Sequence, residues 1–167
     1  FGQFDFILAD LGVSSMQIDN PARGFSYKTQ GPLDLRLDPT KGISASERLK
    51  EIDPMELEGM LYENSDEPYA HQIAQSICAH ISKGKDISTT SDLRAIITNT
   101  LSKIPEANQE DKIKKSCQRC FQALRIDVNN EFEELYTFLN KLPECMAKGG
   151  KVAILTFHSG EDRLVKK

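Results

Sequence analysis

A short apolar run that ends in polar residues most constrains how this chain can fold. Phe6-Ile7-Leu8 is rich in strand-forming residues, and Asp10, Gly12, Ser14 and Ser15 follow it directly. Such a run predicts a buried parallel strand of an α/β sheet. Ligands of open α/β sheets bind beyond the carboxyl ends of the strands, where Asp10 would lie. An aspartate there is also a common turn former, so the segment alone leaves both interpretations open.

A second segment of the same kind lies near the other end of the sequence. Residues 151–157 are again apolar and strand-forming, and His158 and Ser159 follow them. The intervening pattern is helical, so strand, helical crossover and strand predict one right-handed parallel unit. We therefore expect Asp10 and His158 to lie on the same side of the sheet.

Helix signals without intervening strands fill residues 41–115. Ser44 and Glu47 have the spacing of a capping box, which predicts a helix start. Asp53 followed by Pro54 predicts a second start, because proline suits the first helical position. The apolar stripes of these helices are interpreted as packing surfaces.

The remaining helices are expected further along the same stretch and beyond it. Ser65 or Asp66 is predicted to begin a third helix, and Ser91 a fourth. Residues 106–116 are polar and predict a linker, whereas residues 117–142 predict one long amphipathic helix.

The domain organisation follows from these patterns. At 167 residues the chain has room for one domain with an inserted piece. We predict a core formed by residues 1–40 and 116–167, interrupted by an all-helical domain at residues 41–115. Both ends of the sequence have the appearance of cuts through a larger protein.

Charge and length exclude some classes of protein and leave others open. No apolar run approaches the roughly 20 residues of a membrane helix. The net charge of −4 argues against bulk affinity for nucleic acid. A local basic patch and a solvated surface are both open for the cationic residues near the start, which are Arg23, Lys28, Arg36, Lys41 and Arg48.

Two other chemistries lack the motifs they need. Cys117-x-x-Cys120 has no second ligand pair, so a structural zinc site is disfavoured. A hydrolase triad of Ser14 or Ser15 with His158 would lack the G-x-S-x-G elbow. We predict no metal site.

Five blocks of the sequence, in family order, resemble the MraW (RsmH) family. The resemblance implies a methyltransferase that uses S-adenosylmethionine to methylate the exocyclic N4 of a cytosine in small-subunit ribosomal RNA. It also implies a Rossmann-like methyltransferase core, here partial with the N-terminal strands missing, and an inserted all-helical domain. The blocks are DLGVSSMQID at 10–19, RGFS at 23–26, GPLDLRLD at 31–38, FQALRI with VN within 121–129, and FHS with EDR within 157–163.

The same resemblance implies roles for particular residues. Asp10 and Gln17 would contact S-adenosylmethionine. The crevice for methyl transfer would be lined by Ser14, Ser15, Asp19, Arg23, Asn129, His158 and Ser159. Their separate roles are our own inference: we expect Asp10, Ser14, Ser15 and His158 to act in catalysis, and Asp19, Arg23, Arg36, Asn129 and Ser159 to contact the RNA.

The implied partner is small-subunit ribosomal RNA or the assembled small ribosomal subunit, with no membrane. A homodimer is left open. The expected compartment is the cytoplasm, with a mitochondrion or plastid as the alternative. A non-catalytic, RNA-binding or ribosome-associated remnant of the fold is the competing interpretation.

The departures from the family pattern lead to a first prediction. The family's glycine-rich cofactor loop and first strands lie upstream of this sequence, and Gly160 replaces the usual leucine of the last block. Glycine-rich loops let the backbone approach a cofactor closely, so the 167-residue chain by itself should bind little S-adenosylmethionine. Isothermal titration should show no binding, and a submillimolar affinity would contradict this expectation.

Overall fold

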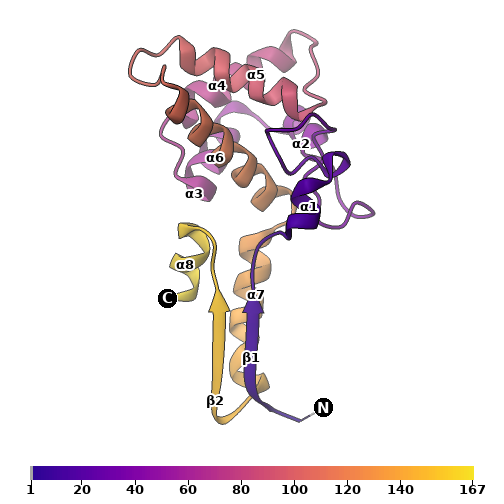
Figure 1. Cartoon of the computed structure of the whole chain (residues 1–167), viewed down its shortest axis with the longest axis vertical. Coiled ribbons are helices and arrows are strands. Elements are labelled where there is room, and N and C mark those ends of the chain that lie inside the picture. The colour runs from indigo at the N-terminus through magenta and orange to yellow at the C-terminus, as the bar shows by residue number, and fades with distance from the viewer. Residues whose placement is uncertain (1) are drawn as a thin grey trace. The chain divides into compact units, whose positions relative to one another are not determined.

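The computed structural model describes residues 2–167, which form two compact units (Figure 1). Residues 2–13 and 130–167 form one, called here the sheet unit, and Ser14–Asn129 forms the other, the helical unit. The elements are β1 Phe4–Asp10, α1 Ser15–Asp19, a 3-10 turn η1 Pro21–Arg23, α2 Ala45–Glu51, α3 Pro54–Ser65, α4 Ala70–Ser82, α5 Thr90–Ser102, α6 Glu110–Val128, α7 Glu131–Cys145, β2 Met146–Leu155 and α8 Ser159–Val165.

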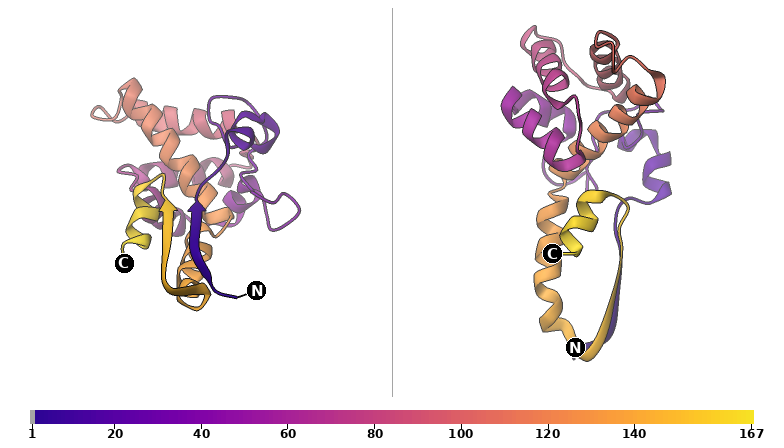
Figure 2. Two further views of the ribbon diagram at one scale, coloured as in Figure 1. Left: turned by 60° about the horizontal axis from the view of Figure 1, so that its bottom comes forward. Right: turned by 90° about the vertical axis from the view of Figure 1, so that its left-hand side faces the viewer.

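The sheet unit contains two parallel strands and two helices. β1 pairs with β2 from Phe6 opposite Lys151 to Asp10 opposite Leu155, with an irregularity near Phe4. Helices α7 and α8 lie on the same side of this sheet (Figure 2). The α/β class with a small parallel sheet is thus confirmed.

The strands differ from the prediction in their burial. Phe4, Phe6 and Leu8 are 50%, 59% and 60% exposed, and no residue of β1 or β2 that the structure describes is fully buried. These three side chains share one face, because successive side chains of a strand point to opposite faces. A parallel strand is buried only when both faces of its sheet are covered. The prediction of buried strands is wrong because, within residues 2–167, the helices of the sheet unit lie on one face of the sheet only.

The helical unit has a continuous apolar core. Helix α3 packs against α4 and α6, and α5 packs against α4 and α6. Each fully buried leucine or isoleucine contributes about 1.5–3 kcal/mol relative to its exposed state. The largest fully buried side chains of these four helices are Leu57, Leu61, Ile73, Ile77, Leu93, Ile97, Leu101 and Leu124.

Two of the predicted helix starts are confirmed. Ser44 caps α2, with its hydroxyl accepting from the Glu47 N–H while the Glu47 carboxylate accepts from the Ser44 N–H. Asp53 caps α3 by accepting from the Glu56 N–H at 2.8 Å, and Pro54 is the first helical residue.

The next two starts are wrong. Asp66 ends α3 in a left-handed conformation, with φ of 53°, and α4 begins only at Ala70. Helix α5 is capped by Thr89 rather than Ser91, and Asp92 completes its capping box. The capping motif Thr-x-x-Asp lies in the sequence two residues before Ser91 and is the stronger signal.

The region predicted as a linker and one long helix is divided differently. Helix α6 already begins at Glu110, and it ends at Val128 instead of continuing. Asn130 has φ of 49°, a left-handed conformation that asparagine tolerates, and α7 starts after it. The second strand, expected from residue 151, begins earlier, because β2 already includes residues 146–150.

A buried carboxyl group in the helical unit leads to a second prediction. Burial raises the pKa of Glu67 from its ordinary value of 4.5, although its carboxylate accepts from the Tyr69 N–H and the Ser116 hydroxyl. A folded-state pKa above the unfolded value makes ionisation oppose folding. Stability is therefore complete below the unfolded pKa and falls as the pH rises from there through the folded pKa.

We expect Glu67→Gln to gain stability relative to the wild type as the pH rises through this window. Urea unfolding at one pH below 4.5 and at neutral pH measures the change. The exposed Glu63→Gln serves as the control and should show no such trend. Parallel pH profiles of the Glu67 variant and the wild type would refute the prediction.

Candidate functional site

The carboxyl ends of β1 and β2 form one edge of the sheet. Asp10 lies opposite Leu155, and the Leu11 N–H donates to the Leu155 carbonyl at 3.2 Å. Asp10 is exposed. Gly12 follows with φ of 93°, and a Cβ there would lie 3.4 Å from the ring of Phe157. The parallel pairing thus brings Asp10 and the segment that precedes His158 to the same edge, as expected.

His158 is held in place by its own helix. Its Nδ1 accepts from the Glu161 N–H at 3.4 Å and thereby caps α8. Its Nε2 lies 3.3 Å from Glu161 Oε1, and the Phe132 ring lies 5.9 Å from the imidazole between centroids. The Nδ1 hydrogen bond and the Phe132 ring restrain the imidazole, and only 11% of its side chain is exposed. Its Nε2 is buried and has no hydrogen-bond partner within residues 2–167.

Glu161 is the site residue that the sequence reasoning missed. Its side chain is 6% exposed, and its Oε2 accepts from the Phe157 N–H at 2.8 Å. One carboxylate therefore contacts both the backbone just after β2 and the imidazole. The signal in the sequence was the spacing His158-x-x-Glu161, which is that of a capping box.

The departure at Gly160 has a structural reason in the sheet unit. Gly160 is buried, and a Cβ there would lie 2.5 Å from Phe132 Cζ. The ring of Phe132 occupies the space that a larger side chain at 160 would need. The same ring, which belongs to α7, packs beside His158.

The segment after β1, in the helical unit, uses two predicted site residues as a helix cap. The Ser14 hydroxyl accepts from the Gln17 N–H, while Gln17 Oε1 accepts from the Ser14 N–H at 2.9 Å. This capping box could have been found in the sequence as Ser-x-x-Gln. Ser15 and Asp19 are the first and last residues of α1, and both are exposed.

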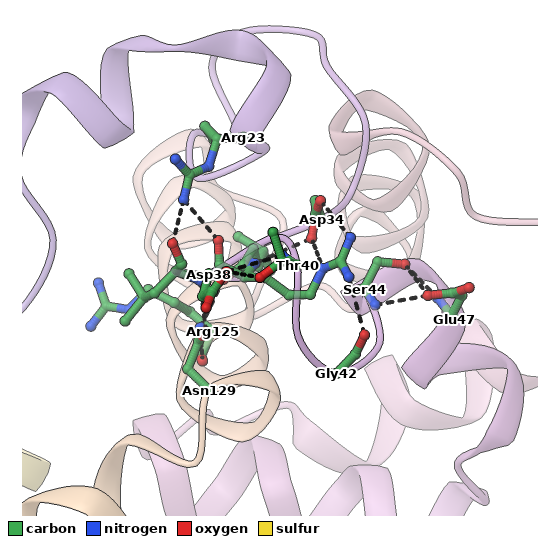
Figure 3. A network of polar contacts seen from close by, with 12 residues as sticks. Arg23, Asp34, Asp38, Thr40, Gly42, Ser44, Glu47, Arg125 and Asn129 are labelled. Carbon is green, nitrogen blue, oxygen red and sulfur yellow. Dashed lines mark hydrogen bonds and ion pairs between the residues drawn. The ribbon is translucent and has the colours of Figure 1, made fainter.

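Three predicted RNA contacts meet around the loop of residues 34–38, also in the helical unit (Figure 3). Arg23 donates to the carbonyls of Arg36 and Leu37 at 3.1 and 2.6 Å. The Arg36 guanidinium pairs with Asp34 through Nε at 2.6 Å and a second nitrogen at 3.1 Å. Such two-point pairs fix the orientation of both groups.

Asn129 joins the end of α6 to this loop. Its Oδ1 accepts from the Leu37 N–H at 2.7 Å, and its Nδ2 donates to the carbonyls of Leu35 and Arg125, both at 2.8 Å. Leu35 is buried and has φ of 64°, a conformation that is costly for leucine. The amide of Asn129 helps to hold it there.

Removal of this amide gives a third prediction. Asn129→Ala leaves backbone groups of the loop without partners, and we expect the free energy of unfolding to fall by about 2 kcal/mol. Urea unfolding measures the loss. Asn108→Ala removes an exposed amide of the same unit and should change stability by less than about 0.5 kcal/mol. Equal effects of the two variants would contradict the role of Asn129.

The predicted site residues thus fall into two sets. The sheet unit holds Asp10, His158 and Ser159, and the helical unit holds Ser14, Ser15, Gln17, Asp19, Arg23, Arg36 and Asn129. Asp10 lies at the same edge of the sheet as the residues after β2. The loop of residues 34–38 contains Arg36 and is contacted by the side chains of Arg23 and Asn129. Their catalytic and binding roles stay predictions.

The expectations of no metal site and no membrane helix concern the cysteine thiols and the length and polarity of the helices. Burial raises the pKa of Cys117 to about 11 and raises that of Cys120 as well, so both thiols are protonated at neutral pH. Residues 2–167 contain no group of three or more metal-binding side chains. Within the same residues, no helix has both the length and the apolar character of a membrane span.

The fold is of the α/β class, with two parallel strands whose carboxyl ends carry several of the predicted site residues. The profile of the MraW methylase family matches residues 1–167, so the chain belongs to this family.

Curated relatives share much of the sequence. A "Ribosomal RNA small subunit methyltransferase H 1" of Lachnoclostridium phytofermentans is 68% identical over 99% of this chain and 45% of the relative. A "Ribosomal RNA small subunit methyltransferase H 2" of Alkaliphilus metalliredigens is 66% identical over 99% and 48%. The "Ribosomal RNA small subunit methyltransferase H" of Francisella tularensis subsp. novicida is 43% identical over 99% and 52%. The chain spans about half the length of these relatives.

Proposed function

We propose that this chain is part of an enzyme that methylates the exocyclic N4 of a cytosine in small-subunit ribosomal RNA, with S-adenosylmethionine as methyl donor. The membership of the MraW methylase family and the names of the relatives support the proposal. The observation that carries it is the shared edge of β1 and β2, where the exposed Asp10 lies beside the segment that leads to His158.

The exposed face of the sheet supports a Rossmann-like core to which this chain contributes only a part. Phe4, Phe6 and Leu8 are half exposed or more, an arrangement that further structure of the complete protein would cover. We propose that the helices of residues 41–115 form the inserted domain of that core.

The residues at the strand ends fit one side of a site for S-adenosylmethionine. Asp10 offers an exposed carboxylate, Gly12 leaves the backbone open, and Phe157 offers an aromatic ring that is 68% exposed. A carboxylate suits the hydroxyl and amino groups of such a cofactor, and an aromatic ring suits its sulfonium. Gln17 is a weaker candidate for contact with the cofactor, because its Oε1 already accepts from the Ser14 N–H.

The chemistry requires orientation and a proton acceptor. Bound S-adenosylmethionine supplies an electrophilic methyl group. The amine of cytosine is a weak nucleophile because its lone pair is conjugated with the ring, so the protein must hold the amine in line and accept a proton from it. Asp10 is the exposed carboxylate at this edge that would accept the proton. His158 follows the other strand of the edge and lies against Glu161.

The proposal extends to the partner and the compartment. The partner is ribosomal RNA or the assembled small subunit, which in a bacterium places the enzyme in the cytoplasm. A homodimer and a home in a mitochondrion or plastid are compatible with the same chemistry.

The proposal is tested with the complete gene product. The protein is incubated with labelled S-adenosylmethionine and small ribosomal subunits from a strain that lacks the gene, and the RNA is digested and analysed by mass spectrometry. We expect labelled N4-methylcytidine at one position. Binding of RNA without any methyl transfer would favour the non-catalytic alternative.

A further inference from the structure

A basic groove lies between α4 and α5 of the helical unit. It has a volume of about 390 Å³. Three lysines line it, Lys83, Lys85 and Lys103, and they come from the ends of both helices and the turn after α4. His80 lines it as well.

No carboxylate lines the groove, within the part of the chain that the structure describes. None of its three lysines has an ion pair with any of residues 2–167. The carboxylate of Asp86, next in sequence to Lys85, is paired with Lys50 at 3.1 Å instead. Because the whole chain carries a net charge of −4, this concentration of unpaired cations is local.

The neutral polar side chains of the groove suit the phosphate and sugar groups of a nucleic acid. Gln72 of α4 and Asn99 of α5 add amide donors, and Ile96 and Ile104 are apolar residues of the lining. Phosphate oxygens and sugar hydroxyls are the usual partners of lysine and amide donors in nucleic-acid complexes. The three lysines lie at the end of α4, in the turn after it and at the end of α5, so the groove offers a chain of phosphates three separate cations.

We propose that this groove binds the phosphodiester backbone of the RNA substrate, at a position in the helical unit separate from the strand-end edge. The inference rests on the proposed function for the identity of the RNA. Lysines at helix ends also interact favourably with the helix dipole, so the test must separate binding from folding.

The test compares two triple variants of the complete gene product that lose the same charge. The groove variant is Lys83→Gln, Lys85→Gln and Lys103→Gln. The control variant replaces the exposed Lys112, Lys115 and Lys141 by glutamine. Fluorescence anisotropy measures the binding of a short labelled single-stranded RNA over a range of chloride concentrations, and thermal melts establish that both variants fold.

We expect the groove variant to lose about tenfold or more in RNA affinity at low salt. The slope of log affinity against log salt should become shallower by about two, since each lysine–phosphate contact in a single strand contributes about 0.7. The control variant should keep the wild-type slope. A third variant with arginine at positions 83, 85 and 103 keeps the charge and should restore binding.

Three outcomes overturn the inference. The groove and control variants could lose affinity equally, the salt slope could stay unchanged, or inorganic phosphate could displace the RNA far more strongly than chloride of the same ionic strength, which indicates a site for a small anion. Methylation of small subunits is measured separately. If the wild-type protein does not methylate small subunits but the groove variant still loses RNA affinity, the proposed function is wrong and the groove remains supported. If the wild-type protein methylates small subunits and the groove variant does so with an unchanged KM, the proposed function remains supported and the inference about the groove is wrong.

Discussion

Replacing Gly31 with alanine is expected to lower the free energy of unfolding by about 3 kcal/mol, the upper range for an overpacked position. A Cβ at Gly31 would lie 1.8 Å from the carbonyl oxygen of Pro21 and 2.8 Å from its carbon. These are backbone atoms, so the strain cannot be relieved by a change of rotamer. The Gly31 backbone is fixed from the other side as well, because its N–H donates to the Thr90 hydroxyl and its carbonyl accepts from the Thr90 N–H.

The matched control for this variant is Gly59→Ala. Gly59 lies within α3, and a Cβ there would meet nothing within 4 Å. Alanine favours helix over glycine, so this variant should gain about 0.5–1 kcal/mol. Urea unfolding of both variants measures the difference. A Gly31 variant as stable as the wild type would mean that the loop does not pack on Pro21 as described.

The second large effect is expected at Asp10. In the complete gene product, Asp10→Asn removes the carboxylate that we propose as proton acceptor and cofactor contact, while keeping the size of the side chain. We expect kcat/KM for methyl transfer to small subunits to fall by about 100-fold or more, the range of general-base effects. Asp10 is exposed at the end of β1, so the fold should not depend on its charge.

Asp5→Asn is the control for this experiment, because Asp5 is an exposed aspartate of the same strand. It should leave kcat/KM and the melting temperature unchanged. A full loss of activity in the Asp5 variant, or full activity in the Asp10 variant, would show that the strand-end carboxylate is not the group that the reaction uses.

The features that the sequence predicted correctly are set by neighbours along the chain. The parallel strands around Phe6 and Val152 follow from apolar runs, and the polar residues after them follow from their position at the strand ends. The caps at Ser44 and Asp53 depend on side chains three residues apart. Local spacing was enough for these elements.

The features that it missed depend on contacts far apart in the sequence or on one backbone angle. Asn130 adopts a left-handed conformation that divides a continuous amphipathic pattern into α6 and α7. Arg23 and Asn129 bond to the backbone of residues 35–37, and no sequence pattern indicates these pairings. The exposure of Phe6 depends on which elements cover the sheet, and this is a tertiary property.

The measurement that tests the central claim most directly is the mass mapping of N4-methylcytidine in small-subunit ribosomal RNA from a strain in which the gene is deleted. We expect the modification to disappear on deletion, to return with the wild-type gene, and to stay absent with Asp10→Asn expressed at the same level. Persistence of the modification in the deletion strain, or its full return with Asp10→Asn, would contradict a methyltransferase site at the ends of β1 and β2.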